Sequence, residues 1–170
     1  GFSSVVFRGI GTNGWGTGSS NAVTATYIDE FPLALRDIDI KFVDMAQIEV
    51  LKGPQGTLYG QSSMGGVMRY ITNKPHFEGV EGGFEGAAAS IADGDTGYQG
   101  SGYVNIPLSD TIAARAVFYQ YDNPGFVDNL GTNTEDVNSE EVTGGRLALR
   151  WQVSDRTEFN LLYLNQTQRV

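Results

Sequence analysis

The second half of the chain contains five segments in which apolar and polar residues alternate with the period of a β-strand. In the fourth segment Leu147 and Trp151 fall on one face, and Arg146 falls on the other. Leu162 and Leu164 interrupt the alternation in the fifth segment. The segments span residues 80–91, 98–108, 111–121, 142–153 and 157–167. This pattern predicts five strands, each with one apolar and one polar face.

The connections between these segments alternate between long and short. Two are tight Ser-Asp turns at 109–110 and 154–155, and the others span residues 92–97 and the acidic stretch 122–141. Outer-membrane β-barrels have this alternation, with short periplasmic turns and long extracellular loops. Trp151 and Phe159 flank a short turn on the apolar face, where an interfacial aromatic girdle would lie. The alternation fits one sheet of a soluble β-sandwich equally well.

The first half of the chain mixes short apolar runs with glycine-rich loops. Strands are predicted at residues 22–29, 45–53 and 65–74, with a compact turn or short helix at 53–64. A long loop at 9–21 carries one aromatic residue, Trp15. These elements predict a small mixed α/β body.

Composition excludes several classes of site. The chain has no cysteine and a single histidine, His76, so it cannot form a disulfide, a thiolate metal site or a histidine cluster. Its net charge of −9 argues against nucleic acid as a partner. The sequence contains no run of 18 apolar residues, so it predicts no transmembrane helix. Membrane-spanning strands stay possible, because each needs only about 9–11 residues.

Enzyme motifs are also missing. The glycine loop GPQGTLYGQSS lacks the GK[ST] ending of a phosphate-binding loop, and there is no GxSxG elbow. We predict no catalytic residue, metal site or cofactor. A cluster of carboxylates could bind a hard cation or could simply be a solvated loop. It comprises Asp128, Glu135, Asp136, Glu140 and Glu141.

The most informative motif is the segment 48–75, which reads IEVLKGPQGTLYGQSSMGGVMRYITNKP. It resembles the end of the plug domain in the TonB-dependent receptor family, whose members typically read IEVxxGPxxxLYGxxAxGGxIxxxTxxP. FRGIG (7–11), TATYIDEFPL (24–33) and IPLSDTIAARAVFYQYDNPGFVDN (106–129) resemble further passages in the family's order.

The resemblance implies a mixed α/β plug domain at residues 1–76, lacking its N-terminal part, and the first antiparallel strands of a transmembrane β-barrel at 79–170. In the family the plug lies inside a 22-stranded barrel. Five strands leave an open edge, which lipid does not tolerate. We therefore expect a fragment of a longer protein, with the signal peptide and the box that contacts TonB lying upstream.

Site residues follow from the same resemblance. A scaffold role is implied for Gly53, Pro54, Leu58, Tyr59, Gly60, Gly65 and Gly66. Arg8 and Lys52 match two basic positions that pair with barrel carboxylates and lock the plug, although Lys52 lacks the bidentate fork of arginine. As an alternative, the two bases are simply solvated.

Substrate contact is implied for the outward apex of the plug, at Asn13, Gly14, Trp15, Leu35 and Arg36. Trp15 could stack on an apolar ligand, and Arg36 could pair with an anionic chelate. As an alternative, the Trp15 ring packs against its own loop and the Arg36 side chain is solvated.

The implied function is active uptake of a scarce solute across the Gram-negative outer membrane, energised by the TonB–ExbB–ExbD complex. An iron–siderophore complex is the default solute, and cobalamin, haem and oligosaccharides are alternatives. A barrel without energy coupling and a soluble β-rich binding module remain other possibilities.

Overall fold

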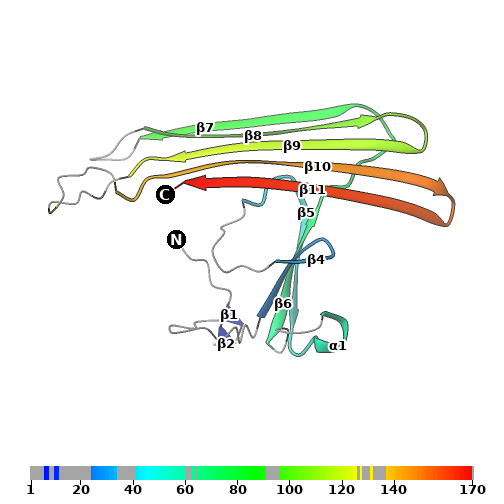
Figure 1. Ribbon diagram of the computed structural model, residues 1–170, viewed down its shortest axis with the longest axis horizontal. Coiled ribbons are helices and arrows are strands. Elements are labelled where there is room, and N and C mark those ends of the chain that lie inside the picture. The colour runs from blue at the N-terminus through cyan, green and yellow to red at the C-terminus, as the bar shows by residue number, and fades with distance from the viewer. Residues whose placement is uncertain are drawn as a thin grey trace. The chain divides into compact units, whose positions relative to one another are not determined.

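The computed structural model describes residues 6–7, 10–11, 24–33, 41–59, 63, 65–90, 96–125, 127, 131 and 137–169. The chain forms two compact units, Gly1–Asn73 and Lys74–Val170. Figure 1 shows both units as ribbons, coloured along the chain. Each is described separately below.

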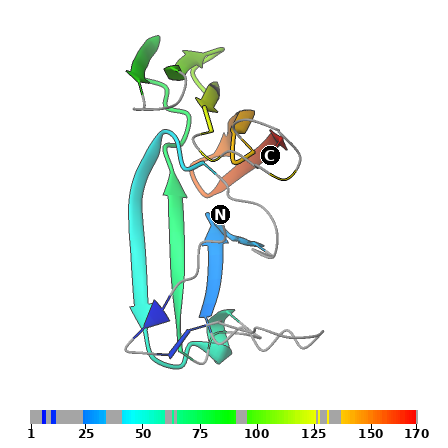
Figure 2. The same ribbon diagram turned by 90° about the vertical axis from the view of Figure 1, so that its left-hand side faces the viewer.

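The first unit is built around a four-stranded mixed sheet with the order β4-β3-β6-β5. Strand β3 pairs in parallel with β6, and the other two pairings are antiparallel. A separate two-stranded ladder joins β1 to β2. Figure 2 shows the long strands of the sheet side by side. The elements are β1 (Val6–Phe7), β2 (Ile10–Gly11), β3 (Thr24–Ile28), β4 (Phe31–Leu33), β5 (Met45–Lys52), α1 (Gly56–Tyr59) and β6 (Gly66–Thr72).

This arrangement confirms the three strands and the short helix that the pattern predicts, and it adds β4 and the β1–β2 ladder. Strand β2 lies within the stretch 9–21 that was predicted as a loop, because two residues are too few to give a strand pattern. Strand β4 was not predicted, because it is three residues long and contains Pro32. It pairs with β3 through a tight turn in which Asp29 has a φ of 50°. Aspartate tolerates this left-handed conformation better than most residues, which favours it at the turn.

Two apolar side chains are buried in the described part of the first unit. Val67 and Ile28 are its buried apolar side chains among the described residues, with 0% and 4% exposed. Tyr27 and Tyr59 meet edge to face with ring centroids 5.1 Å apart, and the Tyr27 hydroxyl donates to the Tyr59 carbonyl at 2.6 Å. These contacts hold α1 against the sheet.

The second unit is an antiparallel meander of five long strands in sequential order, β7 to β11. All five predicted strands are confirmed, and no boundary moves by more than two residues. The strands are β7 (Glu81–Ser90), β8 (Thr96–Pro107), β9 (Ile112–Asn123), β10 (Glu140–Ser154) and β11 (Thr157–Arg169). Their lengths of 10 to 15 residues exceed the usual five or six.

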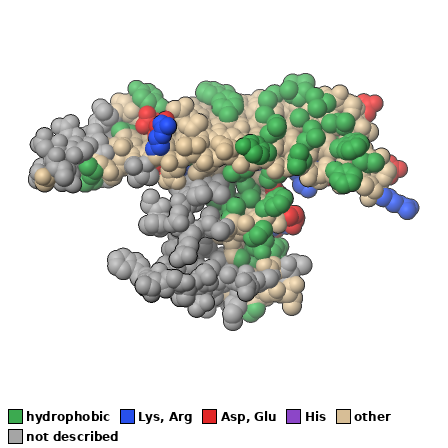
Figure 3. Space-filling view, viewed as in Figure 1, with side chains coloured by type: hydrophobic (Ala, Val, Ile, Leu, Met, Phe, Trp, Pro, Cys, Tyr) green, Lys and Arg blue, Asp and Glu red, His purple; other side chains and the backbone are tan. Residues whose placement is uncertain are grey.

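The two faces of this sheet differ sharply in chemistry. The strand register places one apolar set on a single face, and Figure 3 shows hydrophobic side chains gathered over the sheet. Its most exposed members are Phe84 at 74%, Leu161 at 67% and Tyr163 at 63%. The opposite face carries polar and charged residues, including Glu81, Asn105, Arg115, Arg146, Arg150 and Glu158.

Helices contribute little to the described structure. The single α-helix among the described residues is α1, of four residues. No helix in this part of the chain has the length and apolar character needed to cross a bilayer.

Candidate functional site

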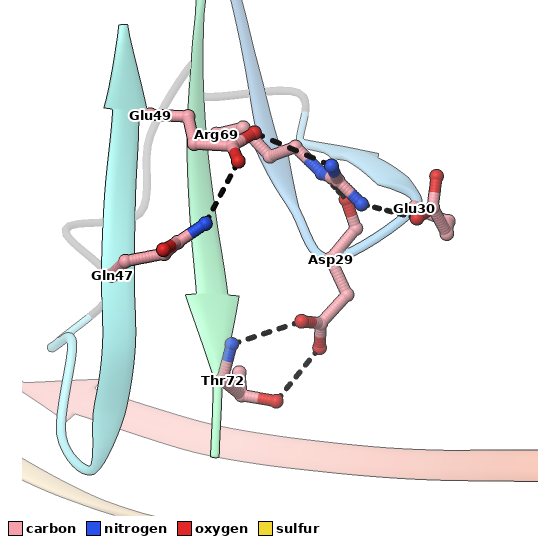
Figure 4. A network of polar contacts seen from close by, with 6 residues as sticks. All are labelled: Asp29, Glu30, Gln47, Glu49, Arg69 and Thr72. Atoms are coloured by element: carbon pink, nitrogen blue, oxygen red, sulfur yellow. Dashed lines mark hydrogen bonds and ion pairs between the residues drawn. The ribbon is translucent and has the colours of Figure 1, made fainter. Parts of the chain in front are cut away.

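The main polar cluster of the first unit surrounds Arg69, in the middle of β6 (Figure 4). The Arg69 Nε donates to the backbone carbonyl of Asp29 at 2.8 Å. One terminal nitrogen lies 3.3 Å from the Glu49 carboxylate, and the other pairs with the carboxylate of Glu30. Gln47 donates to Glu49 at 2.8 Å. One guanidinium therefore joins β6 to β5 and to the turn between β3 and β4.

Asp29 adds a second set of bonds at the same turn. Its carboxylate accepts from the backbone N–H and the hydroxyl of Thr72, at 2.9 Å each. Its own N–H donates to the Tyr70 carbonyl at 2.7 Å. Asp29 and Arg69 together tie the end of β3 to the end of β6, so the cluster stabilises the sheet.

Arg69 and Asp29 carry no sequence pattern that marks them as members of a polar cluster. Arg69 lies directly opposite Glu49 in the β5–β6 ladder. A register irregularity between Met45 and Gln47 precedes that pairing. No sequence pattern marks such a bulge, so the opposition of the two charges could not be foreseen.

The scaffold motif forms the turn between β5 and β6. Gly53 has a φ of 94°, where glycine is strongly favoured, although a Cβ added there would meet nothing within 4 Å. Its N–H donates to the Gly65 carbonyl at 3.2 Å, and the Gln55 N–H donates to the Ser63 carbonyl at 2.8 Å. Backbone conformation, rather than a lack of space, accounts for glycine at position 53.

Other residues of this motif are only partly placed. Gly66 is buried and Pro54 is exposed. Gly60 and the Leu58 side chain lie outside the described residues, and the scaffold role of the whole set stays a prediction.

The predicted lock and apex are not placed by the described structure. Lys52, at the end of β5, has an exposed side chain. Its proposed counterpart Arg8 lies outside the described residues. The same holds for the whole predicted substrate apex, Asn13, Gly14, Trp15, Leu35 and Arg36. Both assignments stay predictions.

Metal chemistry finds no support in the described part of the chain. No three carboxylate or imidazole groups there come together as a metal site. The acidic stretch that could bind a hard cation is only partly described, since Asp128, Glu135 and Asp136 lie outside. Glu140 and Glu141 are in β10, where Glu141 pairs with Arg169 at 3.5 Å.

A second polar cluster lies at the start of the second unit. The side chain of Asn105, in β8, is fully buried and bonds to the backbone of His76 and Gly79. The His76 ring lies 2.9 Å from the Glu81 carboxylate. Sequence analysis missed Asn105, because its partners are backbone atoms 26 and 29 residues away.

Comparison with known sequences identifies relatives of this chain. Residues 1–67 match the family described as TonB-dependent Receptor Plug Domain. The pesticin receptor of Yersinia pestis is 27% identical over 157 residues, which is 91% of this chain and 22% of that protein. The ferrioxamine B receptor of Salmonella typhimurium is 29% identical over 126 residues, which is 72% of this chain and 16% of that protein. The chain thus spans about a fifth of the pesticin receptor.

Solved structures of receptors share the fold. The match to the ferric yersiniabactin uptake receptor of Yersinia pestis covers 98% of this chain and 26% of that receptor, with a TM-score of 0.82 and 22% identity. The match to the pyoverdine outer-membrane receptor of Pseudomonas aeruginosa covers 96% of this chain and 22% of that receptor, with a TM-score of 0.72 and 21% identity. Residues 1–67 therefore match the plug domain of TonB-dependent receptors, as the segment 48–75 predicted, and the whole chain shares its fold with solved receptors of the outer membrane.

Proposed function

We propose that this chain is part of an outer-membrane receptor that takes up an iron–siderophore complex by TonB-dependent active transport. Residues 1–76 act as the plug, and residues 79–170 contribute the first strands of the barrel that surrounds it. Twenty-two strands in all close that barrel, as in plugged outer-membrane transporters.

The observation that carries the proposal is the two-faced sheet of the second unit. Phe84 and Leu161 are among the large apolar side chains that stay exposed on one face. Such a continuous apolar face requires a cover, because exposed patches of this kind mark contact with lipid or protein. Arg150 and Glu158 lie on the other face, and they suit a water-accessible lumen.

Strand length and aromatic placement favour lipid over a second sheet as the cover. Strands of 10 to 15 residues reach the length that a tilted membrane strand needs, about 9–11 residues. Trp151 and Phe159 pair across β10 and β11 with ring centroids 6.1 Å apart, next to the short turn. Aromatic rings of this kind line the membrane interfaces of outer-membrane barrels.

The relatives support iron chelates as the solute. Three of them are receptors named for ferrioxamine B, ferric yersiniabactin and pyoverdine. Cobalamin, haem and oligosaccharides are the alternative solutes within the same mechanism. We assign solute contact to Asn13, Gly14, Trp15, Leu35 and Arg36 at the plug apex. Arg8 and Lys52 lock the plug to barrel carboxylates.

Energy for transport comes from the TonB–ExbB–ExbD complex, which acts on the plug from the periplasm. Among the described residues of the first unit, Ile28 and Val67 are the buried apolar side chains, and this suits an element that must move, since segments with few buried apolar contacts open at low cost.

Uptake of radioactive iron chelates by cells tests this function. Cells lacking the receptor gene should lose uptake of at least one chelate from a panel, and the full-length gene should restore it. Deletion of TonB should abolish that uptake. Uptake that persists without TonB would support a non-energised barrel instead. Recovery of the full-length protein in the soluble fraction would support a soluble binding module.

A further inference from the structure

The chain enters the second unit through residues 74–79, here called the connector. Asn105 holds its backbone at two points. The Asn105 carbonyl oxygen accepts from the His76 N–H at 3.1 Å, and its amide nitrogen donates to the His76 carbonyl at 3.0 Å and the Gly79 carbonyl at 3.1 Å. Because Asn105 is 0% exposed, water does not compete for these bonds.

Arg150 provides a second attachment, from β10. One terminal nitrogen donates to the Pro75 carbonyl at 3.3 Å, and the guanidinium lies 4.9 Å from the ring centroid of Phe77. The Arg150 guanidinium is itself held by Glu158, at 2.8 and 2.9 Å. Glu158 accepts a further bond from Asn160 at 2.7 Å. A chain of polar contacts from β11 thus orients Arg150 toward the connector.

The third attachment involves His76, the one histidine in the 170 residues of this chain. His76 Nε2 lies 2.9 Å from Glu81, and the Tyr103 hydroxyl donates to the same carboxylate at 2.7 Å. The Arg115 guanidinium lies 4.2 Å from the centroid of the Tyr103 ring. The connector is therefore attached to residues of β7, β8 and β10 on the polar face of the sheet.

These contacts use the atoms that a hinge would have to release. A hinge absorbs changes in φ and ψ at a few residues. In the connector both backbone groups of His76 are bonded, as are the carbonyls of Pro75 and Gly79. The fixed φ of Pro75 removes a further degree of freedom.

We propose that the connector is a fixed anchor on the polar face of β8 and β10, and that it stays attached during transport. This inference rests on the proposed function, in which the plug must move. Movement that opens a path is then confined to residues before Lys74. Asn105 and Arg150 are the positioning residues that hold the anchor.

Limited proteolysis of the purified full-length receptor tests the anchor directly. An endoproteinase that cuts after glutamate can probe the bond after Glu78, whose side chain is exposed. We expect wild-type receptor to resist cleavage there, and Asn105→Ala to be cut at least tenfold faster. Arg150→Lys keeps the positive charge but loses the forked guanidinium group, so we expect a smaller increase in the rate of cleavage after Glu78. Arg156→Ala, in the exposed turn after β10, is the matched control and should match wild type.

Two results would overturn the anchor. The first is rapid cleavage after Glu78 in the wild type, and the second is an Asn105→Ala rate equal to wild type. If Asn105→Ala fails to assemble, Arg150→Lys carries the comparison, and an unchanged rate overturns the anchor in the same way.

Uptake assays separate the anchor from the proposed function. At equal amounts in the outer membrane, Asn105→Ala should take up the chelate several-fold more slowly than wild type, whereas a loosened hinge would leave the rate equal or higher. During wild-type uptake, cleavage after Glu78 should not increase, and an increase contradicts the anchor. If wild type transports no chelate, the proposed function fails, while resistance of purified receptor at Glu78 still supports the anchor.

Discussion

The carboxylate of Asp29 accepts both the backbone N–H and the hydroxyl of Thr72, at 2.9 Å each. Thr72 is the last residue of β6, and Asp29 directly follows β3. The bonds therefore close the parallel pair of strands at one end. Thr72 is only 4% exposed, so no water can replace the carboxylate.

Replacing Asp29 should loosen this end of the sheet. Asp29→Ala leaves two buried donors of Thr72 without an acceptor and forces alanine to a φ of 50°, which together cost about 1–3 kcal/mol. Asp29→Asn keeps one acceptor and tolerates the left-handed backbone, so its effect should be smaller. Hydrogen exchange of the Thr72 amide in the full-length receptor should accelerate about tenfold for each 1.4 kcal/mol lost. Asp155→Ala, in an exposed turn of the other unit, should leave it unchanged.

Replacements around Arg69 should follow a fixed order. Arg69→Ala removes three contacts of a side chain that is 20% exposed, and should be the most destabilising. Glu49→Ala removes a partner that is 35% exposed, and Glu30→Ala removes one that is 78% exposed. Pairs as exposed as the Glu30 pair contribute about 0–1 kcal/mol and weaken in salt. Hydrogen exchange across β3 and β6 at low and high salt measures the order. An equal effect of Glu30→Ala and Arg69→Ala would contradict it.

Local periodicity predicted β3, β5 and β6 of the first unit and all five strands of the second, because alternation and turn residues lie within each segment. The alternating connection lengths also indicated the sequential pairing of the second unit, but nothing predicted which strands pair in the first. The parallel ladder of β3 and β6 joins Thr24 to Gly66, and nothing in either segment encodes that register. Leu162 broke the expected alternation in the fifth segment, and it lies half-buried on the polar face opposite Ala148. One apolar residue on a polar face leaves the strand itself intact.

Site residues divide in the same way. The residues of the motif 48–75 are contiguous in the sequence, so the plug domain could be predicted from sequence, and the family match over residues 1–67 confirms it for that part of the chain. Arg69 and Asn105 act through partners 20 to 40 residues away, at positions that only the folded sheet defines. The plug apex and the basic lock came from resemblance, and the described residues do not test them.

Gly144 should tolerate no larger residue. It lies opposite Tyr119 in the β9–β10 ladder, and an added Cβ would stand 2.4 Å from the tyrosine ring. The ring could yield only by breaking its 2.8 Å bond to Gln166. Gly144→Ala should therefore cost about 1–3 kcal/mol, as overpacking does. Gly100→Ala is the control, because its nearest neighbour is 3.8 Å away. The temperature at which the folded barrel unfolds in gel electrophoresis measures both, and equal temperatures would refute the packing argument.

The strongest test of the membrane-facing assignment compares two adjacent positions on β11. Leu161 is 67% exposed on the apolar face, and Asn160 is exposed on the polar face. If lipid covers the apolar face, Leu161→Arg should destabilise the full-length receptor in vesicles by about 2 kcal/mol, the lower end of the range for arginine at the bilayer midplane. Asn160→Arg removes the 2.7 Å hydrogen bond from Asn160 to Glu158 but places a positive charge beside that exposed carboxylate, so its cost should stay below about 1 kcal/mol.

Denaturant unfolding of the receptor in lipid vesicles measures both variants. A sheet whose apolar face meets water predicts the opposite result. An exposed leucine in water can become arginine at a cost within about 0.5 kcal/mol. Equal midpoints for Leu161→Arg and Asn160→Arg would therefore reject lipid as the cover of this face. A large loss for Leu161→Arg alone shows that this face lies in an apolar environment, and recovery with the outer-membrane fraction then separates lipid from a covering protein.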